Sequence, residues 1–85
     1  MAKWKKVFDK VLSGKADKNI PFDELCGLLT RLGFENRQEK GSHCIYFRDG
    51  VVELINLQPR EGGKAKMEQV KQIREILLHY GIGID

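Results

Sequence analysis

Residues 43–57 read HCIYFRDGVVELINL, and this stretch decides the fold. Both of its halves are rich in aromatic and aliphatic side chains, which is typical of β-strands. The dipeptide Asp49-Gly50 between them is typical of a two-residue type I′ turn. The stretch therefore predicts an antiparallel hairpin whose strands are His43–Arg48 and Val51–Leu57.

One further strand and three helices are expected around this hairpin. The polar segment Phe34–Glu39 predicts an edge strand, joined to the hairpin by a turn at residues 40–42. Apolar residues recur at i, i+3, i+4 and i+7 in three other segments, which predicts helices. These segments are Trp4–Leu12, Phe22–Leu32 and Met67–Tyr80. A glycine follows each of them, as expected of residues that end helices.

The predicted order of elements is ααβββα. It is typical of a two-layer α+β domain with a three-stranded antiparallel sheet and helices on one face. Without its first helix, the order αβββα is that of a double-stranded-RNA-binding fold. Residues 1–19 are then an N-terminal helical extension and linker, and residues 20–82 are the core of a single domain.

Composition indicates a cytoplasmic protein. The chain has 85 residues, of which 41% are hydrophobic and 32% charged, with a net charge of +3. It contains neither the roughly 18 consecutive apolar residues of a membrane span nor the apolar stretch of a secretion signal. Cys26 and Cys44 form no CxxC pair, so we expect reduced thiols that pack as small hydrophobic side chains.

His43 is the candidate for proton transfer. It follows Gly41-Ser42 and opens a predicted strand, and an imidazole titrates near pH 6.5. The alternative is a histidine that only packs or faces solvent. The other histidine, His79, falls in the last turn of the last helix, where a cation suits the helix dipole. No spacing of Cys, His and carboxylates typical of a metal site is present, so neither a metal nor a cofactor is expected.

Basic residues flank His43 in the sequence. Arg37 and Lys40 precede it and Arg48 follows it, while a predicted flexible loop at residues 60–66 holds three more cations. These are Arg60, Lys64 and Lys66. If hairpin and loop lie side by side, the cations surround His43 and suit a polyanion. Tyr46 and Phe47 could then stack on bases if they are exposed. The alternative is that the cations only keep the protein in solution.

The sequence also resembles a known family. Leu32-Gly33-Phe34, leading into Gly41-Ser42-His43 and an apolar strand, is similar to the HicA toxins of bacterial type II toxin–antitoxin systems. Asn56-Leu57-Gln58-Pro59 and the closing helix through Gly81-Ile82 fit the same pattern. The resemblance covers about residues 20 to 82, and the first helix resembles the extension of longer family members.

The resemblance implies a function. HicA toxins adopt the double-stranded-RNA-binding-like fold and cleave mRNA as endoribonucleases, and a HicB antitoxin neutralises them by covering the active face. That no metal takes part in the cleavage is our expectation from the lack of a metal-ligand spacing in this sequence. The family histidine corresponds to His43, and the residues expected to bind RNA are Lys40, Ser42, Arg48, Arg60, Lys64 and Lys66. One departure stands out, because many relatives have Arg-His after the proline where this chain has Pro59-Arg60-Glu61.

A ribonuclease mechanism needs few protein groups. The 2′-OH of RNA is the nucleophile, His43 would take its proton as general base, and cations would stabilise the phosphorane. The alternative is an RNA-binding module of the same fold without catalysis. A DNA-binding regulator fits less well, since the last helix has mixed charge and no basic recognition helix is evident.

Overall fold

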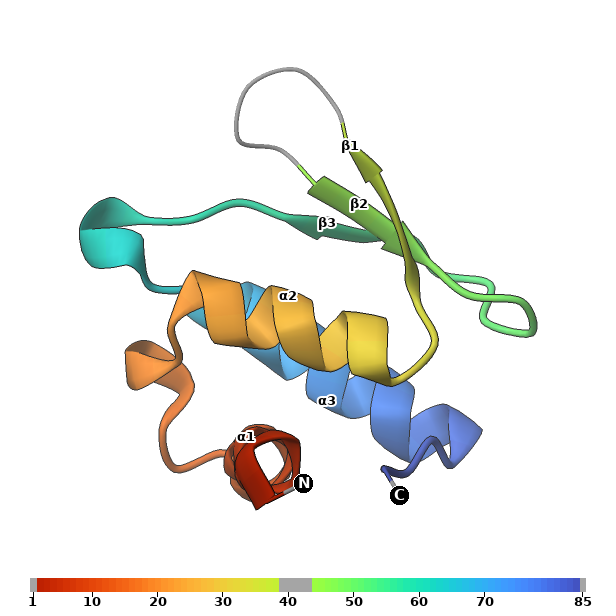
Figure 1. Ribbon diagram of the computed structural model, residues 1–85, viewed down its shortest axis with the longest axis horizontal. Helices are drawn as coiled ribbons and strands as arrows, with labels where there is room; N and C mark the ends of the chain where they lie inside the picture. Colours follow the sequence, from red (N-terminus) through yellow and green to blue (C-terminus); the bar gives the residue numbers. More distant parts are fainter. Residues whose placement is uncertain (1, 39–43, 85) are drawn as a thin grey trace.

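The computed structural model describes residues 2–38 and 44–84 and confirms the order ααβββα (Figure 1). Its main elements are α1 Ala2–Ser13, α2 Phe22–Arg31, β1 Glu35–Gln38, β2 Cys44–Phe47, β3 Ile55–Leu57 and α3 Met67–Tyr80. Two short 3-10 turns, η1 Asp17–Asn19 and η2 Glu61–Gly63, precede α2 and α3. The predicted bounds of the last helix are confirmed at both ends.

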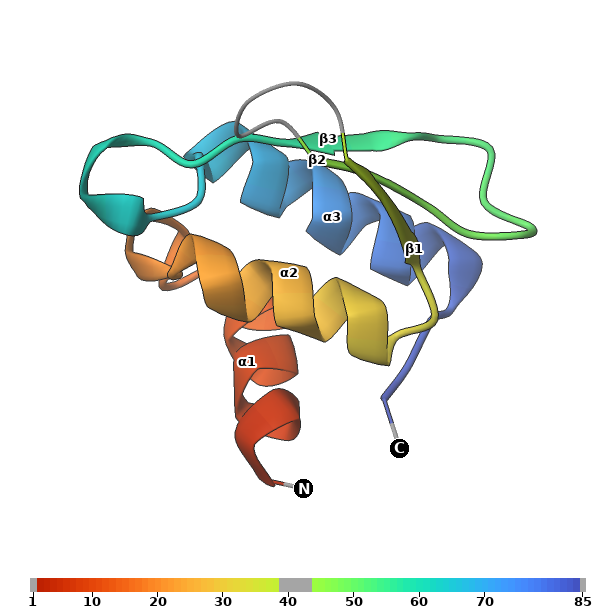
Figure 2. The same cartoon turned by 45° about the horizontal axis from the view of Figure 1, so that its top comes forward.

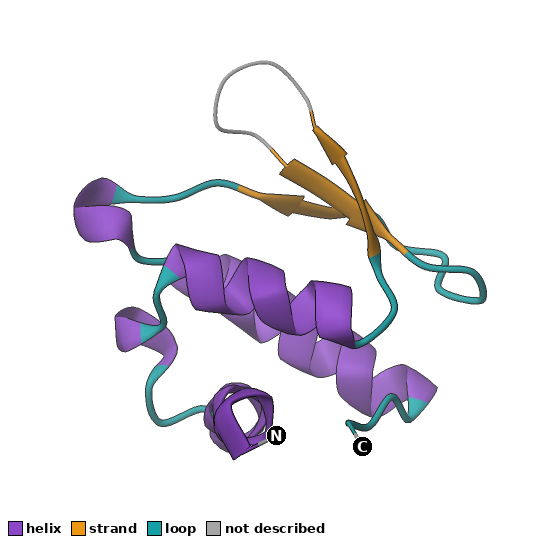
Figure 3. Ribbon diagram, viewed as in Figure 1, coloured by secondary structure: helices purple, strands orange, loops and turns teal. Residues whose placement is uncertain are grey.

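The sheet is antiparallel, with the strand order β1-β2-β3. The helices lie on one side of it, as predicted, and no helix of residues 2–38 or 44–84 covers the other face of the strands (Figures 2 and 3). α2 packs against β1 and α3 against β3, whereas α1 packs against α2 and α3. The first helix therefore adds a further layer behind the helices that cover the sheet.

One hydrophobic core joins all these layers. Its buried residues come from the three helices, from β2 and β3, and from the connecting segments. They include Val7, Val11, Leu25, Leu29, Tyr46, Ile55, Leu57, Ile73 and Leu77. Because α1 contributes residues that are less than a tenth exposed, such as Val11 at 0%, the extension and the core belong to one folded unit.

The end of α2 shows why the chain turns into the sheet at Phe34. Gly33 has a φ of +91°, and its N–H donates to the Thr30 carbonyl at 3.1 Å. The Phe34 N–H donates to the Leu29 carbonyl at 3.0 Å. This is a Schellman motif, which needs a left-handed residue after the helix. The predicted helix-ending role of Gly33 is confirmed, and the buried Phe34 ring anchors the start of β1.

The predicted two-residue type I′ hairpin is wrong. A turn does form at residues 48–51, since the Val51 N–H donates to the Arg48 carbonyl at 3.0 Å. However, Gly50 alone of its two central residues has positive φ, whereas type I′ needs positive φ at both. The strands pair Tyr46 with Ile55 and Cys44 with Leu57, so residues 51–54 lie outside the ladder.

Burial explains this register. A two-residue loop would place Glu53 opposite Tyr46, whose side chain is only 3% exposed. The observed register puts the fully buried Ile55 there instead. Glu53 stays exposed and accepts a hydrogen bond from the Tyr80 hydroxyl at 2.7 Å. That bond lowers the pKa of Glu53 and raises the pKa of Tyr80.

A close contact joins α1 to α2. A Cβ atom added to Gly27 would lie 2.3 Å from Cη2 and 2.9 Å from Cζ3 of the Trp4 indole ring. Real Cβ atoms do not approach other atoms so closely, so the Trp4 side chain or one of the two helices would have to move. Gly27 is therefore required by packing, although it stands in the interior of a helix.

Gly27→Ala is expected to lower the free energy of unfolding by about 1–2 kcal/mol. Alanine favours the helix by about 1 kcal/mol, but overpacking costs up to about 3 kcal/mol. Urea denaturation measures the difference. In a Trp4→Ala background the clash is gone, so the same change should stabilise the protein. A Gly27→Ala protein as stable as the wild type, with Trp4 present, would show that the contact is not tight.

Candidate nucleic-acid interface and active site

The end of the sheet where β2 begins is the candidate site. Cys44, the first residue of β2, pairs with Gln38 on one side and with Leu57 on the other. The last residue of β1, the first of β2 and the last of β3 therefore lie side by side (Figure 1). We call this end, with Gln58 and Lys66 beside it, the β2-start corner. His43 directly precedes Cys44 in the sequence.

Three of the residues predicted to act on RNA lie outside the described residues. They are Lys40, Ser42 and His43. The residues that the structure does describe show which side chains surround the start of β2. Their arrangement shows which of the remaining predicted cations lie close enough to the start of β2 to bind RNA there.

Lys66 lies at the β2-start corner in a hydrogen-bonded network. Its amino group donates to Oε1 of Gln58 at 3.1 Å, and the Gln58 N–H donates to Oε1 of Gln69 at 3.1 Å. Gln58 directly follows Leu57, which pairs with Cys44 at the end of the β2–β3 ladder. The amino group of Lys66 is therefore bound one residue beyond the last pair of that ladder. Lys66 also precedes the first turn of α3, whose N–H groups add partial positive charge.

Gln58 and Gln69 were not predicted as site residues. Gln58 lies between Leu57, which is buried, and Pro59. A polar residue directly after a strand is the feature of the sequence that could have indicated its role in the site. Gln69 gave no signal of its own, because its role depends on the position of α3 under β3. The Gln58 side chain holds the Lys66 amino group, and the Gln69 side chain holds the Gln58 backbone. Both residues therefore position Lys66.

The basic loop is held by backbone hydrogen bonds that the sequence did not predict. Backbone bridges pair Pro59 with Ala65 and Pro21 with Lys64. The Arg60 N–H donates to the Lys64 carbonyl at 2.8 Å, and the Ala65 N–H to the Ile20 carbonyl at 2.9 Å. These bonds fix the loop against the start of α2. Lys64 is thus held beside Pro21 at the start of α2, and Lys66 beside Gln58 after the end of β3.

Arg60 has a structural task in this loop. Its guanidinium donates hydrogen bonds to the carbonyl oxygens of Ala65 and Lys18. The residue remains exposed, so its charge still faces solvent. Arg60 is therefore brought close to Lys64 and Lys66, as predicted, but it points towards η1.

Arg48 is not brought to the β2-start corner. It follows the last residue of β2, roughly 13 Å along the strand from Cys44 at 3.3 Å per residue. Its guanidinium carbon lies 6.0 Å from the centre of the Phe34 ring. Within the described chain, its buried Nη1 has no hydrogen-bond partner. This position fits a packing role at the far end of the sheet.

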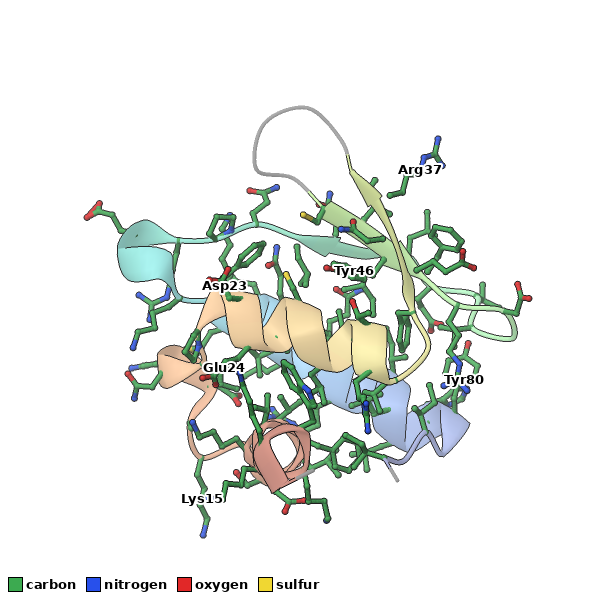
Figure 4. All side chains as sticks on the ribbon, in the orientation of Figure 1. Lys15, Asp23, Glu24, Arg37, Tyr46 and Tyr80 are labelled. Carbon is green, nitrogen blue, oxygen red and sulfur yellow. The ribbon has the colours of Figure 1, made fainter. Side chains whose placement is uncertain are left out.

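Only one of the two predicted stacking residues is available. Tyr46 lies between the sheet and α2 (Figure 4) and is 3% exposed, so it does not meet the condition of exposure on which its stacking on bases depends. Burial raises the pKa of the Tyr46 hydroxyl, and burial also raises the pKa of the Cys26 thiol beside it. Phe47 is half-buried and lies on the opposite face of the sheet, where Glu35 of β1 is its partner across the ladder and Arg37 is the partner of Ile45.

The remaining expectations concern His79, metals and membranes. His79 lies exposed in the last turn of α3 with its ring 4.7 Å from that of Tyr80, as its position in the sequence predicted. In residues 2–38 and 44–84, no three His, Cys, Asp or Glu side chains gather into a metal-binding group. Across the same residues, none of the helices has the length and apolar character needed to span a bilayer.

The chain was compared with protein-family models, with curated proteins and with solved structures. None of the three comparisons gives a match. The interpretation of the site therefore depends on its own geometry and chemistry.

Proposed function

We propose that the protein is the toxin component of a type II toxin–antitoxin pair and cleaves mRNA with His43 as acid–base. We propose further that residues 20–82 form a double-stranded-RNA-binding-like core, as in HicA toxins. The alternative is an RNA-binding module of the same fold that does not cut its ligand. Both readings need a polyanion at the β2-start corner.

One observation carries the proposal. Cys44 opens β2 beside a lysine that Gln58 holds at 3.1 Å, next to the N-terminus of α3. A charged donor in a fixed position suits the charge that develops on a phosphorane. His43, one residue before Cys44, supplies the group that titrates near neutral pH. A general base and a cation close to the scissile phosphate are the groups that RNA cleavage requires.

The proposed reaction needs no group beyond these and the RNA. His43 takes the proton of the 2′-OH, whose oxygen attacks the adjacent phosphorus. The bond from phosphorus to the 5′-oxygen breaks, and that oxygen takes up the proton from the protonated His43, directly or through water. Lys66 would stabilise the negative charge of the phosphorane, with Lys64 as a further cation. The products are a 2′,3′-cyclic phosphate and a 5′-hydroxyl.

The purified protein should cut a labelled mRNA into discrete fragments, in EDTA as well as in Mg²⁺. The nucleophile belongs to the substrate, so a chelator should not remove the activity. Gel electrophoresis of the RNA measures this. A shifted RNA band without any fragments would favour the binding module instead. Activity that only Mg²⁺ restores would contradict the mechanism.

We also propose a HicB-like antitoxin as partner, bound over the face of the sheet that no helix of the described chain covers. Ile45 and Phe47 are half-buried there, and Arg37 points away from the helices (Figure 4). Two apolar side chains within a polar surround are typical of the centre of an interface.

Phe47→Ala should weaken the toxin–antitoxin complex about 10- to 100-fold, because truncation of a central aromatic residue typically costs about 2 kcal/mol. Calorimetry with the product of the neighbouring gene measures the affinity. Leu78→Ala is the matched control, since Leu78 is 66% exposed but belongs to α3. Equal affinities for the two variants, or full ribonuclease activity in the complex, would refute the proposed interface.

A further inference from the structure

The positive charge of this chain is concentrated at its N-terminus. Residues 1–19 contain six lysines and two aspartates, a net charge of +4, whereas residues 20–85 contain nine lysines and arginines against ten acidic residues. Both aspartates are paired, Asp9 with Lys5 at 3.1 Å and Asp17 with Arg74 at 3.0 Å. The other lysines of this segment therefore set the charge of the surface around α1.

Three of these lysines lie on one side of α1. Lys3, Lys6 and Lys10 follow one another at intervals of three and four residues, which places them on one helix face. They line a hollow of about 360 Å³, whose acidic residue is Glu24 of α2. Lys5 lies on the opposite side of the helix, where Asp9 neutralises it.

The basic surface continues beyond the end of α1. Lys15, Lys18 and Lys71 line a second hollow of about 280 Å³. Lys18 and Arg60 line a third, of about 240 Å³, with Glu68. Lys18 belongs to both hollows, and within residues 2–38 and 44–84 it forms no ion pair.

The second and third hollows share Lys18 and Met67 and connect η1 with the basic loop. The Arg60 guanidinium donates a hydrogen bond to the Lys18 carbonyl and so fastens the basic loop to η1. The views of the ribbon show η1 and η2 at the same end of the molecule (Figures 1 and 2). The loop that contains Arg60 ends at Lys66, in the β2-start corner. We call Lys6, Lys10, Lys15, Lys18 and Arg60 the lysine track.

A nucleic-acid backbone is the ligand that suits this track. Exposed cations in a row match the regular negative charges of phosphates and release their counterions on binding. An anionic membrane surface also attracts lysines, but a helix that binds a membrane inserts its apolar face. The apolar face of α1 is unavailable, since Val7, Phe8 and Val11 are 4%, 7% and 0% exposed.

We propose that the lysine track is an RNA-binding surface that holds the single-stranded substrate outside the β2-start corner. This inference rests on the proposed function, because it names RNA as the ligand. It assigns the N-terminal segment a role of its own: residues 1–19 supply four of the five cations of the track, and the core supplies the groups that cut.

Fluorescence anisotropy of the full chain with a labelled, fully 2′-O-methylated RNA tests the inference, because this probe binds but cannot be cut. Lys10→Gln/Lys18→Gln removes two track cations. Lys5→Gln/Arg31→Gln is the matched control, with the same loss of charge from exposed positions off the track. Each phosphate contact on a single strand contributes about 0.7 to the slope of log K against log salt.

The track variant should lower that slope by about 1.4 and weaken binding about 25-fold at 0.1 M salt, whereas the control should stay near the wild type. Equal losses in both variants would overturn the inference. So would binding of the wild type to phosphatidylserine vesicles but not to the RNA probe.

Cleavage of ordinary RNA by the same variants is measured in a separate assay. Track-dependent binding without cleavage would refute the proposed ribonuclease alone, and cleavage without track dependence would refute the track alone.

Discussion

His43→Ala is expected to lower the rate of mRNA cleavage by about 10²–10⁴-fold, the usual cost of removing one acid–base group. The proposed mechanism contains no second group that titrates near pH 7 and could take the 2′-OH proton. A cleavage time course with purified protein measures the loss, and growth after induction reports the toxicity. Circular dichroism should show an unchanged fold.

His79→Ala is the control for this substitution. His79 is exposed in the last turn of α3, at the far end of that helix from Lys66. The variant should therefore cut RNA at the wild-type rate. A folded His43→Ala protein that cuts as fast as His79→Ala would remove His43 from the mechanism and leave the binding module as the better reading.

Asp17→Ala is expected to lower the free energy of unfolding by about 3 kcal/mol. Both carboxylate oxygens of Asp17 accept from Arg74, at 3.0 and 3.1 Å, and Asp17 is only 8% exposed. Arg74 also donates to the Val11 carbonyl at 3.0 Å, so the pair fastens the end of α1 to α3. Loss of one partner leaves a partly buried cation without its counterion, which typically costs 3 kcal/mol or more.

The control for this effect is Asp9→Ala. Asp9 also forms an ion pair, with Lys5 at 3.1 Å, but both side chains are 59% exposed. Water screens such a pair, so its loss should change stability by less than about 1 kcal/mol. Urea denaturation compares the two variants. If they lose the same amount of stability, the ion pair between Asp17 and Arg74 does not hold α1 in place.

Local patterns predicted the helices because their causes are local. The repeat of apolar residues in Met67–Tyr80 and the left-handed Gly33 after α2 need no information from distant residues. The strand register could not be read in the same way. Asp49-Gly50 is compatible with several hairpins, and the choice depends on whether Glu53 or Ile55 lies opposite the buried Tyr46.

The contacts that organise the site are long-range, and this is why the sequence did not reveal them. Arg74 and Asp17 are 57 residues apart in the chain, and Arg60 and Lys18 are 42 apart. Gln58 and Lys66 meet only because the loop between them closes on the bridge of Pro59 with Ala65. The basic residues were visible in the sequence, but their division between the β2-start corner, the lysine track and the far end of β2 required the fold.

The chemical nature of the RNA ends tests the central claim most directly. A labelled mRNA is incubated with the purified protein in EDTA, and the fragments are identified by mass spectrometry. Attack by the 2′-OH, with His43 as base, predicts 2′,3′-cyclic phosphate or 3′-phosphate ends together with 5′-hydroxyl ends, and formation of these fragments that is at least about a hundredfold slower with His43→Ala. Fragments with 5′-phosphate and 3′-hydroxyl ends would contradict the account, because they would show that water and not the 2′-OH attacked the phosphorus.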